Sequence, residues 1–231
     1  MRRKLLVATI LFYASVCSMT AQTVTAVQIL QNMKQRFALV RDYTVTLTLS
    51  VDMERMQIPE MVVTLFFKQP DKVHFESKNF SMIPKEAIAL NPAQLIDKFD
   101  ATLMSTEKGA QGPIYRLRLI SKPEKGKPVR ESYIWVDGTR WVVTRFEATP
   151  SESRKLFFDF EYVEIDGKYT LPSRVSGRFD TQPPSDSTAE KMYSPQRVPR
   201  KGSVTMVYSD YKVNTNLPDE MFEKKKEEKK K

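Results

Sequence analysis

A strict alternation of apolar and polar side chains over residues 43–54 constrains the fold more than any other feature of the sequence. Its even-numbered positions are threonine, serine or acidic, and its odd-numbered positions are apolar: Tyr43, Val45, Leu47, Leu49, Val51 and Met53. A period of two predicts a long β-strand with one face in the core and the other in water. Burying each aliphatic side chain of this face contributes roughly 1.5–3 kcal/mol, so another part of the chain or a ligand must cover it.

The same alternation returns along most of the chain. We predict further strands at residues 61–68, 72–77, 102–107, 114–120, 130–136, 141–148, 155–165, 169–179 and 203–213. Asp137-Gly138 and Asp166-Gly167 lie between apolar runs and predict hairpin turns. Trp135 and Trp141 flank the first turn, and we expect them either to stack across it or to lie at a cavity mouth.

Helical spacing is confined to two regions. Residues 27–40 predict one amphipathic helix, and residues 83–99 predict one or two short helices, with Asn91-Pro92 as a typical helix start. We therefore expect an α+β fold in which about ten antiparallel strands form a strongly curved sheet and short helices cover its concave face.

The apolar surface of this sheet is large. Val63, Leu65 and Phe67 face inward on the second strand, and residues 155–165 repeat the pattern with Leu156, Phe158 and Phe160. Two short helices can cover part of such a face, and any shortfall would leave an apolar cavity. Pattern alone leaves two alternatives open: a cavity that binds lipid, or a fully packed core without a ligand.

The ends of the chain differ from its body. Three basic residues followed by an apolar run at 5–17 predict a signal peptide over residues 1–21, cut between residues 18 and 22, and hence export to the periplasm. A lipoprotein signal acylated at Cys17 is one alternative, disfavoured by Val16 before it, and an uncleaved anchor is another. Residues 22–222 then form one domain, with a proline-rich polar excursion at 180–202, and residues 223–231 form a charged, disordered tail.

Charge and composition exclude several classes of function. The net charge of +9 falls to about +2 once both termini are set aside, so we expect no nucleic-acid partner. One cysteine and one histidine exclude zinc sites, disulfides and Cys–His nucleophilic pairs. Asp159 and Glu161 share the outer face of one strand, where two neighbouring carboxylates are usually solvated surface charges rather than catalytic groups. His74 has no second histidine to act with. We expect no enzyme activity, no metal and no cofactor.

Several short segments resemble the periplasmic outer-membrane lipoprotein carrier (LolA-like) family. They are residues 29–33 with Tyr43 and the Thr-rich strand that follows, and the stretch Phe66-Phe-Lys-Gln-Pro-Asp-Lys-Val-His-Phe75. Residues 133–137, 160–172 and 211–222 are similar to the broader lipoprotein-sorting relatives of this family. The resemblance implies an unclosed β-barrel with helices as a lid, whose hydrophobic cavity takes the acyl chains of lipoproteins. It also implies partners for transport at the inner and outer membranes. The proteobacterial carriers have an arginine that holds the lid shut where this chain has Gln69, a neutral amide.

We therefore predict a monomeric, non-enzymatic periplasmic carrier that binds acyl chains of lipoproteins or a similar lipid. The predicted cavity residues are Val45, Leu47, Leu49, Val51, Met53, Val63, Leu65, Phe67, Phe75, Leu156, Phe158 and Phe160, with Gln69 as the lid contact. The alternative is an envelope signalling or scaffold protein of the same fold, which binds a partner protein through residues 180–202 or an edge strand.

Overall fold

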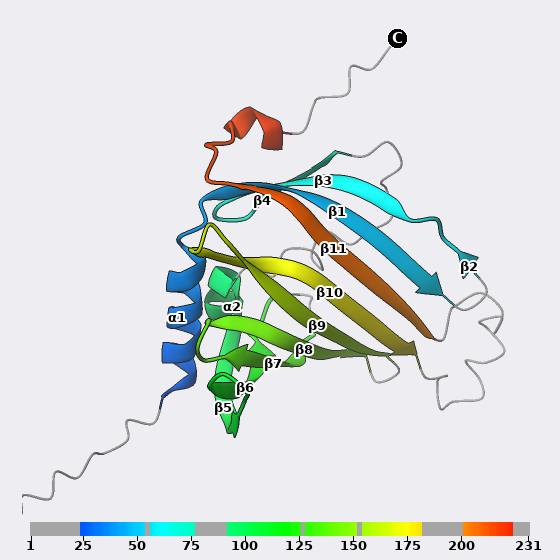
Figure 1. The fold of residues 1–231 in the computed structure, drawn as a ribbon. Helices are drawn as coiled ribbons and strands as arrows, with labels where there is room; N and C mark the ends of the chain where they lie inside the picture. The colour runs from blue at the N-terminus through cyan, green and yellow to red at the C-terminus, as the bar shows by residue number, and fades with distance from the viewer. Residues whose placement is uncertain are drawn as a thin grey trace, which may run out of the picture.

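A computed structural model describes residues 24–53, 56–76, 92–125, 128–151, 154–181 and 201–223 (Figure 1). Its helices are α1 (Ala26–Phe37), α2 (Pro92–Lys98) and a short 3-10 turn η2 (Asp219–Phe222). Its strands are β1 (Asp42–Met53), β2 (Met56–Gln57), β3 (Met61–Lys68), β4 (Lys72–Glu76), β5 (Phe99–Lys108), β6 (Pro113–Ser121), β7 (Glu131–Asp137), β8 (Val142–Ser151), β9 (Arg154–Ile165), β10 (Tyr169–Thr181) and β11 (Lys201–Val213).

The strands form one antiparallel sheet that does not close. Their order is β4-β3-β1-β11-β10-β9-β8-β7-β6-β5, and the two-residue β2 pairs with β1 beside this path. Each predicted strand is present with ends shifted by a few residues; β5 begins at Phe99, inside the segment predicted as helical. The curved, unclosed antiparallel sheet with few helices confirms the predicted fold class.

Helix α1 begins at Ala26, one residue before the predicted start, and Thr25 caps its first turn. The Thr25 side chain accepts a hydrogen bond from the Gln28 backbone N–H, and the Gln28 side chain accepts one from the Thr25 backbone, which together form a capping box. Ala26, Ile29, Leu30 and Met33 make one buried stripe at helical spacing. The helix ends at Phe37, earlier than predicted, and Val40 is buried beyond its end.

Two hydrophobic clusters fill the concave side of the sheet. The first lies over β1, β3, β10 and β11 and includes Leu47, Leu65, Val175 and Met206. The second joins α1 and Leu95 of α2 to the inner faces of β5–β8. Phe160 of β9, at the middle of the sheet, packs against both clusters. The two helices therefore cover mainly the β5–β8 half, and Figure 1 shows them at one end of the long strands.

The predicted hairpin turns are both present. Residues 138–141 join β7 to β8, and residues 166–168 join β9 to β10. Asp166 and Gly167 have φ values of 52° and 61°, the left-handed pair that a tight hairpin turn requires. Trp135 and Trp141 do not stack on each other, because Trp141 lies flat against Tyr115 with ring centroids 6.0 Å apart.

Several predictions fall on residues outside the described ranges. These are the signal peptide, the helices expected before Pro92, most of the 180–202 excursion, and the tail from residue 224. The described ends of the excursion are strand: β10 runs to Thr181 and β11 begins at Lys201. Among the described residues, no helix combines the length and the apolar character needed to cross a membrane.

Candidate functional site

The structure divides the twelve predicted cavity residues into two groups. Six are at most 1 % exposed: Val45, Leu47, Leu49, Val63, Leu65 and Phe67. The other six are half-buried: Val51, Met53, Phe75, Leu156, Phe158 and Phe160. Because a side chain beside a water-sized void would show accessible surface, the first group has no free space next to it in this conformation. A ligand could reach it only if the covering side chains moved.

The half-buried residues at the far ends of the strands form a continuous apolar surface. Strand register places Val51 opposite Val204 of β11, and Phe158 opposite Phe146 of β8. Gly177 lies between Val204 and Phe158 in the same row. We call the following half-buried set the concave band: Val51, Met53, Phe146, Leu156, Phe158, Phe179 and Val204. Most of it lies toward the strand ends away from α1 and α2 (Figure 1), and Phe146 also packs against the second cluster.

Three members of the concave band were missed by sequence reasoning. Phe146, Phe179 and Val204 lie within predicted strands, but their positions beside Phe158, Leu156 and Val51 depend on strand register. The signal that could have found Phe179 and Val204 is the alternation continued through residues 175–179 and 204–208.

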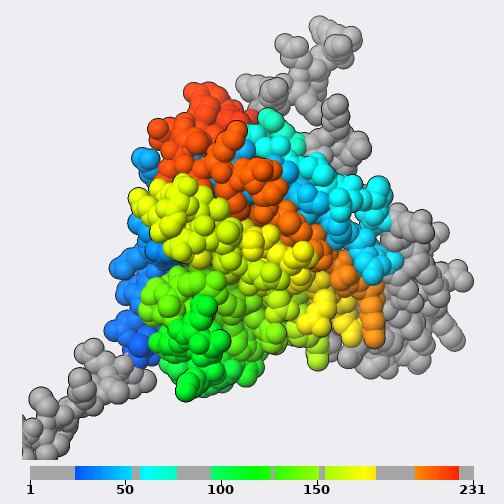
Figure 2. Space-filling model, in the orientation of Figure 1, coloured from blue at the N-terminus to red at the C-terminus, as the bar shows by residue number. Residues whose placement is uncertain are grey.

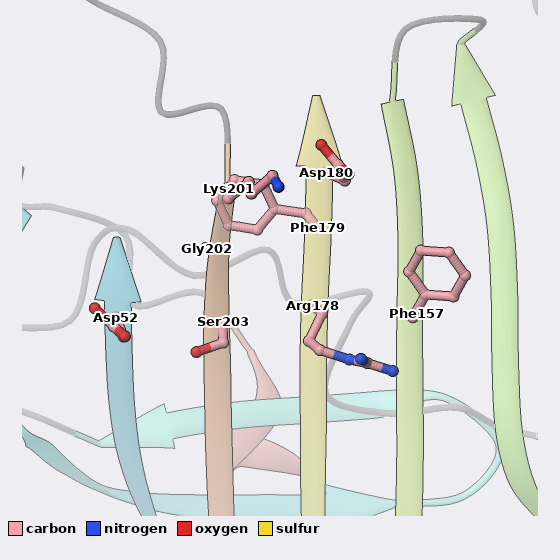
Figure 3. Close-up of a pocket in the computed structure, with 8 residues that line it drawn as sticks. All are labelled: Asp52, Phe157, Arg178, Phe179, Asp180, Lys201, Gly202 and Ser203. Carbon is pink, nitrogen blue, oxygen red and sulfur yellow. The ribbon is translucent and has the colours of Figure 1, made fainter. Parts of the chain in front are cut away.

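Two glycines shape the concave band. A Cβ on Gly177 would lie 2.6 Å from Phe158 Cε1 and 2.7 Å from Val204 Cγ1, so both side chains close over the bare backbone. A Cβ on Gly202 would lie 2.3 Å from Phe179 Cζ. Figure 3 shows the Phe179 ring beside Gly202. Large apolar side chains on neighbouring strands therefore cover both glycines, as aromatic residues often do in sheets.

An open hollow of about 990 Å³ lies at the strand ends next to the concave band (Figure 3). It is lined by Asp52, Phe157, Arg178, Phe179, Asp180, Lys201, Gly202 and Ser203. Phe179 and Gly202 belong to the concave face, whereas Asp52, Ser203, Arg178 and Phe157 form one row on the convex face. The hollow therefore meets both faces of the sheet, and it has the volume of a small-molecule site.

Gln69 joins the sheet to the end of α1. Its Nε2 donates to the carbonyl oxygens of Phe37 (3.1 Å), the last residue of the helix, and Val40 (2.6 Å), three residues beyond it. The side chain thus contacts the end of α1 through neutral hydrogen bonds. An arginine there would make charge-assisted bonds, which are roughly twice as strong.

The polar residues weighed for catalysis are engaged elsewhere. Asp159 accepts from Arg145 Nε at 2.8 Å, and Glu161 is exposed. His74 Nε2 lies 3.8 Å from Glu76 Oε1, and its ring packs near Phe66. Within the described ranges, no three His, Cys, Asp or Glu side chains gather as a metal site would need. Burial raises the pKa of Tyr43, Tyr162, Tyr208 and Tyr211 above its usual value, so these hydroxyls stay protonated near neutral pH.

Solved structures share this fold at low sequence identity. A DUF1329 family protein from Desulfovibrio piger aligns with a TM-score of 0.58 and 15 % identity, over 84 % of this chain and 94 % of that one. A LolA superfamily protein from Nitrosomonas europaea aligns with a TM-score of 0.57 and 15 % identity, over 87 % and 99 %. The sequence matches no protein-family model, and no curated protein matches it. The fold is thus an open LolA-like β-barrel.

Proposed function

We propose that this protein is a non-enzymatic periplasmic carrier that binds an acyl chain of a lipoprotein or a similar lipid on the concave band. The observation that supports this proposal is the half-buried concave band. It is a run of apolar side chains on adjacent strands that α1 and α2 leave partly open. The LolA-like fold supports a binding or carrier role rather than catalysis.

Binding energetics support partial burial of the ligand. At about 0.8 kcal/mol per methylene, a 16-carbon chain offers on the order of 12 kcal/mol of gross burial. Three fully enclosed chains would exceed the roughly 18–21 kcal/mol ceiling of non-covalent affinity. A carrier that must release its cargo therefore needs either an incompletely enclosing surface or an opening step that costs energy. The six fully buried residues would become available only through such an opening.

The direct test measures the affinity for a fluorescent acyl probe. Phe158→Gln and Leu156→Gln replace a band side chain by a polar one. Each should weaken binding roughly tenfold to a hundredfold, as expected for losing one buried apolar side chain. Val163→Gln is the matched control, because Val163 is on the same strand and 38 % exposed. Equal affinities for all four proteins, or no uptake of the probe by the native protein, would refute the proposal.

A second test identifies the cargo. The protein is purified from a bacterial periplasm and extracted with organic solvent, and the extract is analysed by mass spectrometry. We expect a lipid or acylated peptide with the native protein and less of it with Phe158→Gln. The same fractionation tests the location, because the exported protein should lack its first residues and appear in the periplasmic fraction.

A further inference from the structure

The convex face of the sheet carries aromatic side chains where an exposed sheet face usually carries polar ones. On β7, Ile134 and Val136 are buried in the concave cluster, so Tyr133 and Trp135 point to the opposite side. Phe157 of β9 lies on that side as well, because it pairs with Arg178 and Glu147 rather than with the concave residues. All three rings are half-buried without a described helix above them.

Arginines lie against these rings. The guanidinium carbon of Arg116 lies 4.9 Å from the Tyr133 ring centroid and 5.0 Å from that of Trp135. Arg145 approaches Trp135 from the next strand at 5.8 Å. Arg178 lies 5.8 Å from the Phe157 ring centroid. Arginines and aromatic rings thus alternate across strands β6–β10. Because each ring holds a guanidinium group against it, the long arginine side chains are ordered before any partner binds.

Arg116 differs from its neighbours in having no acidic partner within the described part of the chain. Arg118 is held by Glu131 through two hydrogen bonds of 2.9 and 3.1 Å, and Arg145 is held by Asp159. Arg116 makes ring contacts instead, and its buried Nε has no hydrogen-bond partner there. Since no described acid neutralises this guanidinium, a carboxylate bound at its remaining nitrogens would make charge-assisted hydrogen bonds there.

The surface continues toward the hollow at the strand ends. Arg116 on β6 and Arg178 on β10 are separated by four strand spacings across the sheet, about 19 Å, and by two residues along the strands. Phe157 and Arg178 also line the hollow, so an extended segment lying across the strands could place an apolar side chain there. In Figure 2 the outer surfaces of β8–β11, light green to orange, are in view without a coloured helix across them.

We propose that this convex patch, formed by Arg116, Tyr133, Trp135, Arg145, Phe157 and Arg178, binds an acidic segment of a partner protein, with one carboxylate on Arg116. Tryptophan, tyrosine and arginine are the residue types that dominate binding energy at protein interfaces. Glu131, Glu147 and Asp159 lie among the arginines on the same face. These fixed carboxylates would be repelled by a uniformly anionic lipid surface, whereas a peptide can place its acids beside the cations alone.

A selection experiment tests the partner chemistry without assuming its sequence. Random peptides displayed on phage are selected on the immobilised full-length protein, and in parallel on the Arg116→Gln variant. We expect Asp and Glu to be enriched among peptides that bind the native protein, and those peptides to bind Arg116→Gln about tenfold more weakly. Selection of the same peptides by both proteins, or peptides without acidic enrichment, would overturn the proposal.

A fluorescence titration then locates the binding. In a Trp141→Phe background, Trp135 is the one tryptophan left and reports on Arg116 directly. A selected peptide should change its emission, and a version with Gln for Glu should not. Arg118→Gln is the matched control, since it removes the same charge from the same face of the same strand but from an already paired arginine. Its affinity should stay within about twofold of the native value, and Arg116→Lys should fall between the two.

Two outcomes would assign the surface differently. Equal losses in Arg116→Gln and Arg118→Gln would mean general charge attraction and would reject a carboxylate site on Arg116. Arg116-dependent binding to phosphatidylglycerol vesicles, with no peptide selected, would assign the patch to a membrane instead. Acyl-probe affinity should be unchanged in Arg116→Gln, because the patch and the concave band lie on opposite faces, so this proposal and the carrier proposal fail independently.

Discussion

Replacing Gln69 measures how much one amide contributes to holding α1 on the sheet. Gln69→Ala removes the bonds from Nε2 to the carbonyl oxygens of Phe37 and Val40. The Phe37 carbonyl keeps a second donor, the Val40 backbone N–H at 3.0 Å, so the loss falls mainly on the shorter bond to Val40. We expect the free energy of unfolding to fall by about 1–2 kcal/mol, and the midpoint of thermal unfolding by about 2–8 °C.

The assay is urea unfolding of the native protein, Gln69→Ala, Gln69→Glu and the control Gln35→Ala. Gln35 is exposed on α1, so its replacement should change stability by less than about 0.5 kcal/mol. Gln69→Glu should be less stable than Gln69→Ala at neutral pH, because its carboxylate faces two carbonyl oxygens at the negative end of a helix. That environment raises the carboxyl pKa in the folded state, so this variant should regain stability as the pH falls. If Gln69→Ala and Gln35→Ala are equally stable, the two hydrogen bonds do not hold the helix.

Asp42 is 2 % exposed and accepts hydrogen bonds from the backbone N–H groups of Thr215 (2.8 Å) and Asn216 (3.2 Å). Asp42→Ala should therefore lower the free energy of unfolding in urea by about 3 kcal/mol and speed amide hydrogen exchange at residues 214–216. Unchanged exchange at these residues would contradict this prediction. Gly177→Ala should displace Phe158, lower the free energy of unfolding by about 1–3 kcal/mol and weaken binding of the acyl probe. If this variant bound the probe as tightly as the native protein does, Phe158 would not shape the site. Desolvation of the hydroxyl raises the pKa of Tyr43, Tyr162, Tyr208 and Tyr211, whereas tyrosine in the unfolded chain ionises at about pH 10, so the free energy of unfolding should fall as the pH rises above that value. Tyrosinate absorbance and circular dichroism should then change together, and ionisation of all tyrosines with the fold intact would refute their burial.

Local patterns predicted much of the fold, because strand alternation and turn residues act over a few positions. The alternation at 43–54 identified β1 and its inner face, and Asp166-Gly167 identified the turn into β10. The helix boundary at Phe37 was missed, since Val40 continues the helical spacing but reaches the core from the loop that follows. β5 was predicted to begin at 102, because residues 83–99 were assigned to helix, although Phe99, Ala101 and Leu103 already alternate with Asp100 and Thr102.

The candidate site was predictable only in part. The twelve cavity residues were chosen by their face on a strand, and of the eight on the first two inner faces, six are buried while Val51 and Met53 are half-buried. Which residues remain half-open depends on where the helices lie, and α2 covers the β5–β8 half rather than the far ends of β1 and β9. Sequence periodicity contains no information about that choice.

By itself, the sequence determined the period of each strand, the hairpin turns, the start of α1 and the absence of paired cysteines or histidines. Each of these depends on backbone geometry over a few residues or on simple counts. The tertiary structure decided what lies beside what: Phe158 and Val204 over Gly177, Gln69 beneath the end of α1, and Arg116 between Tyr133 and Trp135. Strand register and helix placement set these contacts, and both are fixed by packing between residues far apart in the chain, where a shift of one position would exchange the two faces of a strand.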